Sequence, residues 1–378
     1  MGNITIKNLS RVLLGLALCL TINKSQAITT TVKGAIPSVV SESSGLDYNG
    51  NASFWTHNDG FGDNRLYKVN FSGTLTQTIT VTGATNYDWE DLTHDANRDY
   101  MFIGDFGNNN CDRTNLCVYR IPYPHTGVVS AAADAIHFSY PDQRSIPSSW
   151  MNFDVEAFCH FNGNIYLFTK TDGSAIGYTK MYMIPDNPGT YVATLVDSFY
   201  TNDRTTSADI NADGTALVLI SNSHIHVFKN FSGNNFFNGS HTQINISGSW
   251  TQKESVTFTS NNEIYLTDED NGSGNNLYYV SLSGYIPAAT TNAVNEIENS
   301  SASVYPNPAS ELVHFDLSKQ FKTVSIQLYD ITGKLVNSVS YDNSQQVVMN
   351  IDKYSPGIYF YKILAEGNLL KTERLIIQ

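Results

Sequence analysis

A repeat of short β-strand-like segments is the feature that most constrains the fold of this chain. Five times, a short segment with an apolar residue is followed by a polar turn, a second apolar segment and then a third. Short alternating runs separated by Gly, Asn, Asp and Ser are typical of strands rather than helices. The first segments of the five units are Ser44–Leu46, Glu90–Leu92, Glu156–Phe158, Ala208–Ile210 and Glu254–Val256.

Four-stranded units repeated around an axis predict an all-β fold of the β-propeller type. The first four units each contain a fourth strand-like segment, whereas the fifth lacks one. The segment Ile28–Val32 is a candidate to complete the fifth unit from the other end of the chain. We therefore expect a propeller over residues 28–287. Five blades are favoured, and six are the alternative if insertions hide a unit.

The C-terminal part reads as a separate small domain. Residues 288–300 are polar and lack an apolar period, which indicates a linker. Seven short strand-like segments follow within residues 301–378, separated by turn pairs such as Thr332–Gly333 and Pro356–Gly357. Strands of this length and spacing predict a small immunoglobulin-like β-sandwich.

Three ordered motifs in this domain carry a resemblance to a known family. They are Val304–Ser310, Ile326–Val336 and Ser355–Ile363, followed by the ending Arg374–Ile377. Their order and spacing resemble the type A C-terminal sorting domain of the type IX secretion system. The resemblance implies passage through an outer-membrane translocon of a Gram-negative bacterium, with the protein secreted or held at the cell surface. An ordinary accessory sandwich is the alternative.

The N-terminus is consistent with export. Lys7 and Arg11 precede an apolar run over Leu13–Ile22 that is too short to span a bilayer comfortably. Small residues then precede a cleavage site after Ala27, so residues 1–27 are predicted to be a signal peptide. Cys19 offers a lipoprotein alternative, although the bulky Leu18 before it disfavours lipidation.

Charge and cysteine content narrow the partners and the compartment. The formal net charge is -13, and an acidic surface repels phosphate backbones, so no nucleic-acid partner is expected. Cys111 and Cys117 lie six residues apart in a loop, and an oxidising compartment favours a disulfide between them over two free thiols. Cys159 lies in an apolar stretch and is expected to be a small core residue.

Acidic side chains recur at equivalent places in the repeats, and equivalent places in a propeller converge on its axis. Carboxylates gathered there repel one another unless a cation, water or protonation relieves them, and calcium accepts such a donor set. The alternative is a hydrated channel balanced by Lys170. The predicted metal ligands are Glu90, Glu156, Glu254 and Glu269. The predicted ligand-binding residues are these four together with Asn58, Trp89, Asp105, Lys170 and Asp209, with Trp89 either stacking on a ligand or packing between blades.

Two functions remain open. Segments such as Asp88–Asp91 and Gly104–Asn109 resemble a group of secreted bacterial propeller proteins, which implies architecture more than activity. The first hypothesis is a binding module for an extracellular glycan, protein or small molecule. The second is a calcium-dependent hydrolase of an ester, lactone or phosphoester, as phytase-like and lactonase-like propellers are. The sequence contains no complete set of catalytic residues, which favours the binding hypothesis. It also contains no cluster of Lys and Arg for a phosphate-rich substrate, which counts against a phytase-like activity.

Overall fold

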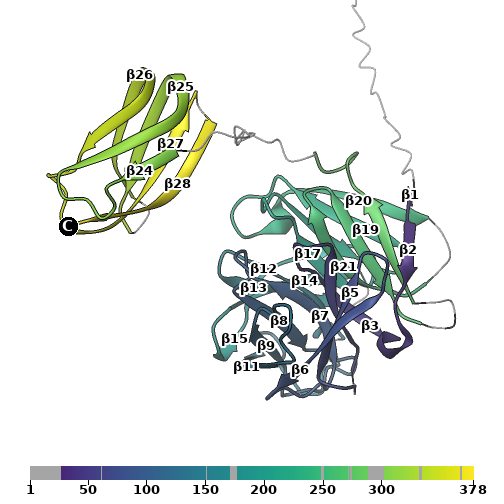
Figure 1. Cartoon of the computed structure of the whole chain (residues 1–378). Helices are drawn as coiled ribbons and strands as arrows, with labels where there is room; N and C mark the ends of the chain where they lie inside the picture. Colours follow the sequence, from purple (N-terminus) through teal and green to yellow (C-terminus); the bar gives the residue numbers. More distant parts are fainter. Residues whose placement is uncertain are drawn as a thin grey trace, which may run out of the picture. The chain divides into compact units, whose positions relative to one another are not determined.

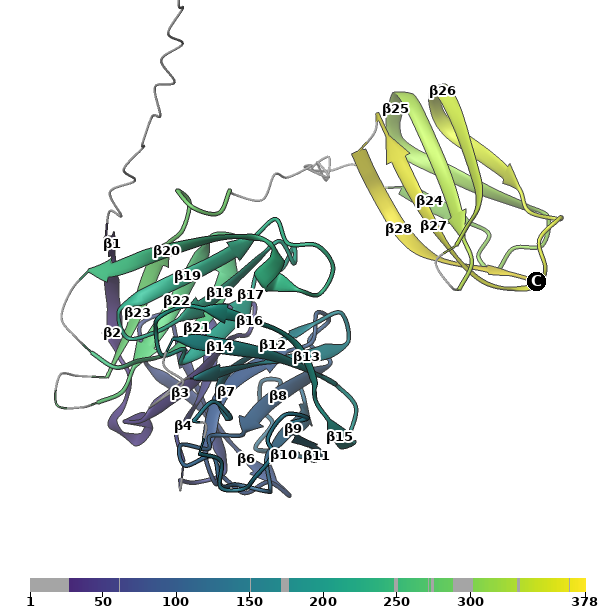
Figure 2. The same cartoon turned by 180° about the vertical axis from the view of Figure 1, so that it is seen from behind.

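The computed structural model describes residues 27–60, 62–149, 151–170, 177–247, 251–270, 272, 275–287, 302–331, 334–366 and 368–378. They belong to two compact units, one ending at Ile286 and the other beginning at Pro287, which Figures 1 and 2 show from opposite sides. The predicted signal peptide up to residue 26, the linker 288–300 and the turn Thr332–Gly333 lie outside the described residues. Among the described residues, no helix has the length and apolar character needed to cross a membrane.

The first unit consists mainly of strands, arranged in five described sheets with mostly antiparallel pairing, and includes the short 3-10 helices η1 (Ser38–Val40) and η3 (Phe236–Asn238). The first sheet consists of β3 (Ser43–Tyr48), β4 (Ser53–Asn58), β5 (Arg65–Asn70), β6 (Leu75–Thr82) and β10 (Ser130–Ala132). The second sheet consists of β7 (Trp89–His94), β8 (Tyr100–Asp105), β9 (Cys117–Pro122), β11 (Asp134–Ser139) and β15 (Gly189–Val192). The third sheet consists of β12 (Asp154–Phe161), β13 (Asn164–Lys170), β14 (Tyr178–Pro185) and β16 (Thr194–Tyr200). The fourth sheet consists of β17 (Ser207–Ile210), β18 (Ala216–Ile220), β19 (His224–Lys229), β20 (Ser240–Ser247) and β1 (Ile28–Thr29). The fifth sheet consists of β21 (Lys253–Ser260), β22 (Glu263–Asp268), β23 (Asn276–Ser281) and β2 (Thr31–Ala35).

The first strands of these sheets contact one another in cyclic order. Strand β3 packs against β7, β7 against β12, β12 against β17, β17 against β21, and β21 again against β3. The hydrophobic core lies between neighbouring sheets. On β8, for example, Met101 packs into the cluster shared with the first sheet, whereas the adjacent Phe102 packs into the cluster shared with the third. Successive side chains of a strand point to opposite faces, so each sheet is covered on both sides.

The fifth sheet takes its outer strand from the start of the unit. Thr31 pairs with Tyr279 and Ala35 with Asn276, so β2 runs antiparallel to β23. The expected completing segment was Ile28–Val32. The pairing instead involves Thr31–Ala35, because Ile28 and Thr29 form a short parallel pairing with β20 of the neighbouring sheet.

The expected disulfide between Cys111 and Cys117 is wrong for this structure. Both thiols are free and buried. Cys111 packs with Phe102 on one side of the second sheet, whereas Cys117 packs with Trp89 on the other side. The two side chains therefore belong to different core clusters, and closeness in sequence does not bring the sulfur atoms together. Cys159 is buried in a third cluster, as expected of a core residue.

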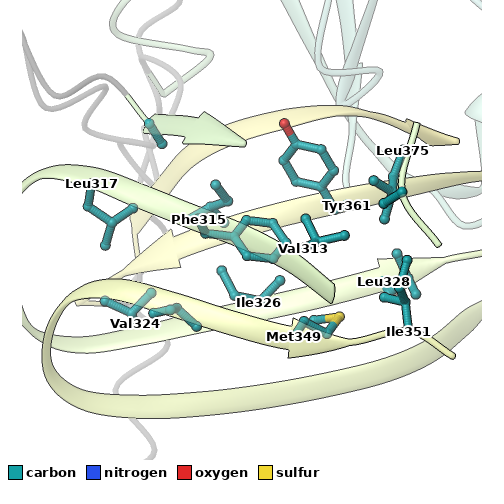
Figure 3. Packing of buried hydrophobic residues seen from close by; sticks show 14 of the residues in the cluster. Val313, Phe315, Leu317, Val324, Ile326, Leu328, Met349, Ile351, Tyr361 and Leu375 are labelled. Carbon is teal, nitrogen blue, oxygen red and sulfur yellow. The ribbon is translucent and has the colours of Figure 1, made fainter. Parts of the chain in front are cut away.

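The second unit forms one described sheet around its own core. Its strands are β24 (Ala302–Tyr305), β25 (Leu312–Tyr329), β26 (Leu335–Asn350), β27 (Gly357–Ala365) and β28 (Asn368–Ile377). Where separate short strands were expected, β25 and β26 continue through register shifts, which explains why the seven segments become five strands. Figure 3 shows Val313, Phe315 and Ile326 packed with Tyr361 in this core. The immunoglobulin-like assignment stays a prediction.

Candidate functional site

One end of the first unit gathers the polar residues because of how the first two strands of each sheet pair. The start of every first strand lies opposite the end of the second strand. The paired residues are Ser43 and Asn58, Trp89 and Asp105, Asp154 and Lys170, Ser207 and Ile220, and Lys253 and Asp268. Since the first strands contact one another in a ring, these pairs lie around a common centre.

A β-bulge positions each of three glutamates at this end. The pairing register of the first and second strands skips one residue near the start of β7, β12 and β21, and the skipped residues are Glu90, Glu156 and Glu254. A bulge leaves its extra residue out of the ladder and redirects its side chain. The first sheet has the same irregularity at Gly45, whose positive φ of 63° suits glycine. The fourth sheet pairs without a shift, and it contributes no glutamate.

Three carboxylates form the tightest group, here called the carboxylate cluster. Asp59 follows β4, Asp88 precedes β7, and Glu90 lies on β7. One carboxylate oxygen from each residue lies within 4.8 Å of the other two. Two glycines allow this approach. A Cβ atom at Gly107 would lie 2.0 Å from Oε1 of Glu90, and one at Gly60 would lie 2.4 Å from Oδ1 of Asp88. The backbone at these two glycines therefore lies directly against the carboxylates, and the side chain of a larger residue would occupy the same space as the carboxylate oxygens.

The electrostatics of the cluster favour a bound proton or a bound cation. Burial, together with the charges of Glu156 and Asp88, raises the pKa of Asp59 to about 7. Burial also raises the pKa of Asp88 to about 6, against the lowering effect of Arg113. Burial and the charge of Glu156 raise the pKa of Glu90 well above its usual value. Ionised carboxylates at this site therefore repel one another strongly.

Glu156 connects the cluster to the remaining predicted acids. Its Oε1 atom lies 2.8 Å from Nζ of Lys170, and the residue as a whole is only 3% exposed. Burial raises the pKa of Glu254 and Glu269, and the charge of Glu156 contributes to both increases. The structure thus brings Glu90, Glu156, Glu254, Glu269 and Lys170 within electrostatic reach of one another. A single lysine faces them from the described residues, and Asp154 adds a further buried acid beside Glu156.

Asp105 and Asn58 lie at the same end but are engaged by other groups. Oδ1 of Asp105 lies 2.8 Å from Nη2 of Arg113 and accepts a hydrogen bond from the backbone N–H of Asp88. The side chain of Asn58 donates to the carbonyl of Val39, 2.9 Å away, and accepts from the N–H of Glu42. Asp105 therefore orients the segment that carries Asp88, and Asn58 holds the loop before β3.

Trp89 and Asp209 are not brought to the cluster. Trp89 is fully buried between sheets, where Nε1 donates to the carbonyl of Thr85 and the indole contacts His57. It packs between sheets and offers no free face to a ligand, so its stacking role is corrected. Asp209 accepts hydrogen bonds from the N–H of Phe258 and the hydroxyl of Thr257 on β21. Its carboxylate joins two sheets, because alternation along β17 directs it away from the centre.

Sequence reasoning missed Asp59, Asp88 and Asp154 as site residues. Asp59 and Asp88 lie just outside strands, in loops whose Asp, Asn and Gly content is equally typical of turns. The repeat alignment also made Glu269 the equivalent of Lys170 in the fifth unit. The strand pairing shows that Asp268 is the equivalent residue. The glycines were a usable sequence signal. Gly60 follows Asp59 and Gly107 follows Phe106, each just after the second strand of its sheet, where the backbone must approach the carboxylates closely.

The donor set of the cluster fits calcium. Hard cations such as Ca²⁺ take carboxylate and carbonyl oxygens at about 2.3–2.6 Å, with several ligands in flexible geometry. The cluster supplies carboxylates from two sheets, and the glycine walls leave backbone groups close by. An ion would neutralise charge that Lys170 alone cannot balance.

Comparison with known proteins identifies the C-terminal unit. Residues 303–378 match the family described as secretion system C-terminal sorting domain. This match covers the region where the sequence motifs resemble a type IX sorting domain. The chain therefore carries a C-terminal secretion signal, which indicates an exported protein, secreted or at the cell surface, that interacts with the type IX machinery.

The comparisons give no such assignment for the first unit. No curated protein matches the chain. One similar solved structure is the extracellular domain described as part of a hybrid two-component system of B. thetaiotaomicron, with 10% identity and a TM-score of 0.31. It covers 93% of this chain, which spans 57% of that protein. Another is the complex of KlAtg21 with the coiled-coil of AgAtg16, with 14% identity, a TM-score of 0.31, and coverage of 63% of this chain and 66% of that one.

Proposed function

We propose that this chain is an exported five-bladed β-propeller whose acidic end binds a calcium ion and, through it, an extracellular ligand. The cyclic contacts of the five first strands support the propeller. The observation that carries the binding role is the carboxylate cluster, in which Asp59, Asp88 and Glu90 converge within 4.8 Å inside glycine walls. A cation held there presents open coordination positions to the hydroxyl, carboxylate or carbonyl oxygens of a glycan, protein or small molecule.

The calcium part is tested first. Titration calorimetry of the metal-free protein with Ca²⁺ should give one binding event. Glu90→Gln should weaken it at least tenfold, because the substitution removes a ligand charge. Glu311→Gln is the matched control, since Glu311 is exposed on the second unit. Equal affinity in both variants, or no binding in the wild type, would leave the cluster balanced by protons and Lys170 without metal.

The binding role is then separated from hydrolysis. A hydrolase is the second candidate, because Asp59 lies beside Asp88 and Glu90 in the cluster and burial raises its pKa to about 7. A general acid or base works best when its pKa lies near the working pH. A glycan array and a panel of lactones, phosphoesters and glycosides are assayed with and without Ca²⁺. Calcium-dependent capture without turnover supports the binding module. Turnover that Asp59→Asn abolishes would replace it with the hydrolase.

A further inference from the structure

A second group of metal-ligating side chains shares no residue with the carboxylate cluster. His224 and His226 lie on β19, and alternate residues of a strand point to the same side. Asp203, in the segment between β16 and β17, reaches both of them. Its Oδ2 atom lies 2.5 Å from Nδ1 of His224 and 3.3 Å from Nε2 of His226. One donor atom from each residue lies within 4.8 Å of the other two.

The surroundings hold these donors in place. The hydroxyl of Ser221 donates to Oδ2 of Asp203 at 2.6 Å. Nδ1 of His226 lies 3.0 Å from Nε2 of His241 on β20, and the two rings stack. His226 is almost fully buried, whereas 26% of the His224 side chain is exposed. The group is therefore rigid on one side and open to solvent on the other.

We propose that Asp203, His224 and His226 bind a divalent transition-metal ion, with zinc as the best fit. Two imidazoles and one carboxylate are ligands that zinc accepts, while calcium prefers oxygen donors throughout. Three protein ligands leave a fourth position for water or an external donor, as in zinc sites with an open position. The site is separate from the proposed calcium site in both residues and metal chemistry.

The position of His241 supports a metal site over a simple hydrogen-bond network. A metal-bound histidine usually donates its other ring N–H to a neighbouring acceptor, which fixes its tautomer. If Nε2 of His226 binds the ion, Nδ1–H donates to Nε2 of His241.

The geometry requires a small adjustment on binding. Donor atoms on a tetrahedral zinc at about 2.0–2.2 Å lie roughly 3.3 Å from one another. The pair Asp203–His226 already has this separation. The pair Asp203–His224 must open by about 0.8 Å, which is a rotation of the partly exposed His224 ring. An ion would also join the segment after β16 of the third sheet to β19 of the fourth.

The test is zinc titration of the full-length metal-free protein, followed by calorimetry, with Co²⁺ as a spectroscopic replacement. We expect one Zn²⁺ to bind with micromolar or tighter affinity, and Co²⁺ to give the intense visible absorption of four-coordinate cobalt. His224→Gln and Asp203→Asn should each weaken Zn²⁺ at least tenfold. His241→Phe removes no ligand and should weaken it about 10- to 100-fold, the usual effect of a partner that orients a ligand.

Matched controls separate this site from other binding. His125→Gln with His137→Gln removes exposed histidines elsewhere and should leave the affinity unchanged. Glu90→Gln should affect Ca²⁺ and not Zn²⁺, so failure of one site is distinguishable from failure of the other. Thermal melts identify variants that fail to fold. If Asp203→Asn fails to fold, His224→Gln still tests the site, because the His224 side chain is partly exposed and its replacement disturbs the core less. Wild-type binding weaker than about 100 μM, or affinity retained in a folded His224→Gln protein, overturns the proposal.

Discussion

The carboxylate of Asp91 on β7 accepts a hydrogen bond, 3.1 Å long, from the hydroxyl of Ser207 on β17, although these strands belong to sheets that are not neighbours in the ring. Asp91 also accepts from the N–H groups of Phe158 on β12 and Ala208 on β17. Ser207 in turn accepts from the N–H of Val256 on β21. Hydrogen bonds thus connect four of the first strands across the centre.

Loss of this connection should destabilise the first unit. Asp91→Ala leaves the backbone N–H groups of Leu92, Phe158 and Ala208 without this acceptor, and each buried unpaired group costs about 1–3 kcal/mol. Ser207→Ala should cost about 1–3 kcal/mol, since it leaves the N–H of Val256 unpaired. Chemical denaturation of both single variants and the double variant should give a coupling of about 0.5–3 kcal/mol. The exposed Asp134→Ala serves as the control, and strictly additive effects would contradict the connection.

The metal-free protein should lose stability as the pH rises from about 4 to 7. The pKa of Asp59 is about 7 in the folded protein and 3.8 when unperturbed. Its contribution is fully present below the unfolded value and is lost as the pH passes through the folded value, because the unfolded chain ionises first. At about 1.36 kcal/mol per unit, the loss is at most on the order of 4 kcal/mol. Denaturation in EDTA should show this decline, and Asp59→Asn should make it smaller, with the remainder due to Asp88 and Glu90, whose pKa values are also raised.

Lys170 provides a test of how the acidic end is balanced. Lys170→Met removes the cation 2.8 Å from Glu156 while keeping an unbranched side chain. The metal-free variant should melt at a lower temperature, because an unpaired buried carboxylate is costly. Its calcium affinity should increase, since the site has become more negative. A variant that binds calcium more weakly than the wild type would show that Lys170 helps to hold the site in shape.

Gly107 should be essential for the carboxylate cluster. A Cβ atom there would meet Glu90 at 2.0 Å and Asp88 at 2.5 Å, so Gly107→Ala must displace both carboxylates. We expect calcium affinity to fall at least tenfold. Gly284→Ala is the matched control, because a Cβ atom at Gly284 meets no atom within 4 Å. Calorimetry compares the two variants, and unchanged binding in Gly107→Ala would place the ion elsewhere.

Export should require the C-terminal unit and should remove the N-terminal segment. Deletion of residues 301–378 is expected to trap the protein in the periplasm, because residues 303–378 match a sorting domain. N-terminal sequencing of the exported wild type should begin at Ile28. Fractionation and immunoblotting measure the distribution, with a periplasmic marker enzyme as the reference. Normal appearance of the truncated protein outside the cell would contradict the requirement.

The repeat made the strands of the first unit predictable, because buried strands need apolar residues and turns need Gly, Asn and Asp. It also identified the glutamates Glu90, Glu156 and Glu254 as equivalent. The repeat did not reveal that a β-bulge redirects these side chains. A bulge depends on the pairing register of two strands and has no characteristic residue type in the sequence. Asp203 escaped attention because its partners His224 and His226 are distant in sequence and meet it only in the fold.

The pairing of β2 with β23 has a consequence for the life of the chain. Thr31–Ala35 leaves the ribosome first, yet its partner Asn276–Tyr279 is made near the end of the unit. The fifth sheet therefore cannot be completed until nearly all of the first unit has been synthesised, and until then β2 lacks its partner strand. Closure of the fifth sheet should therefore be a late and slow step in the folding of this unit, because pairing two segments so far apart in sequence carries a large loop-closure entropy.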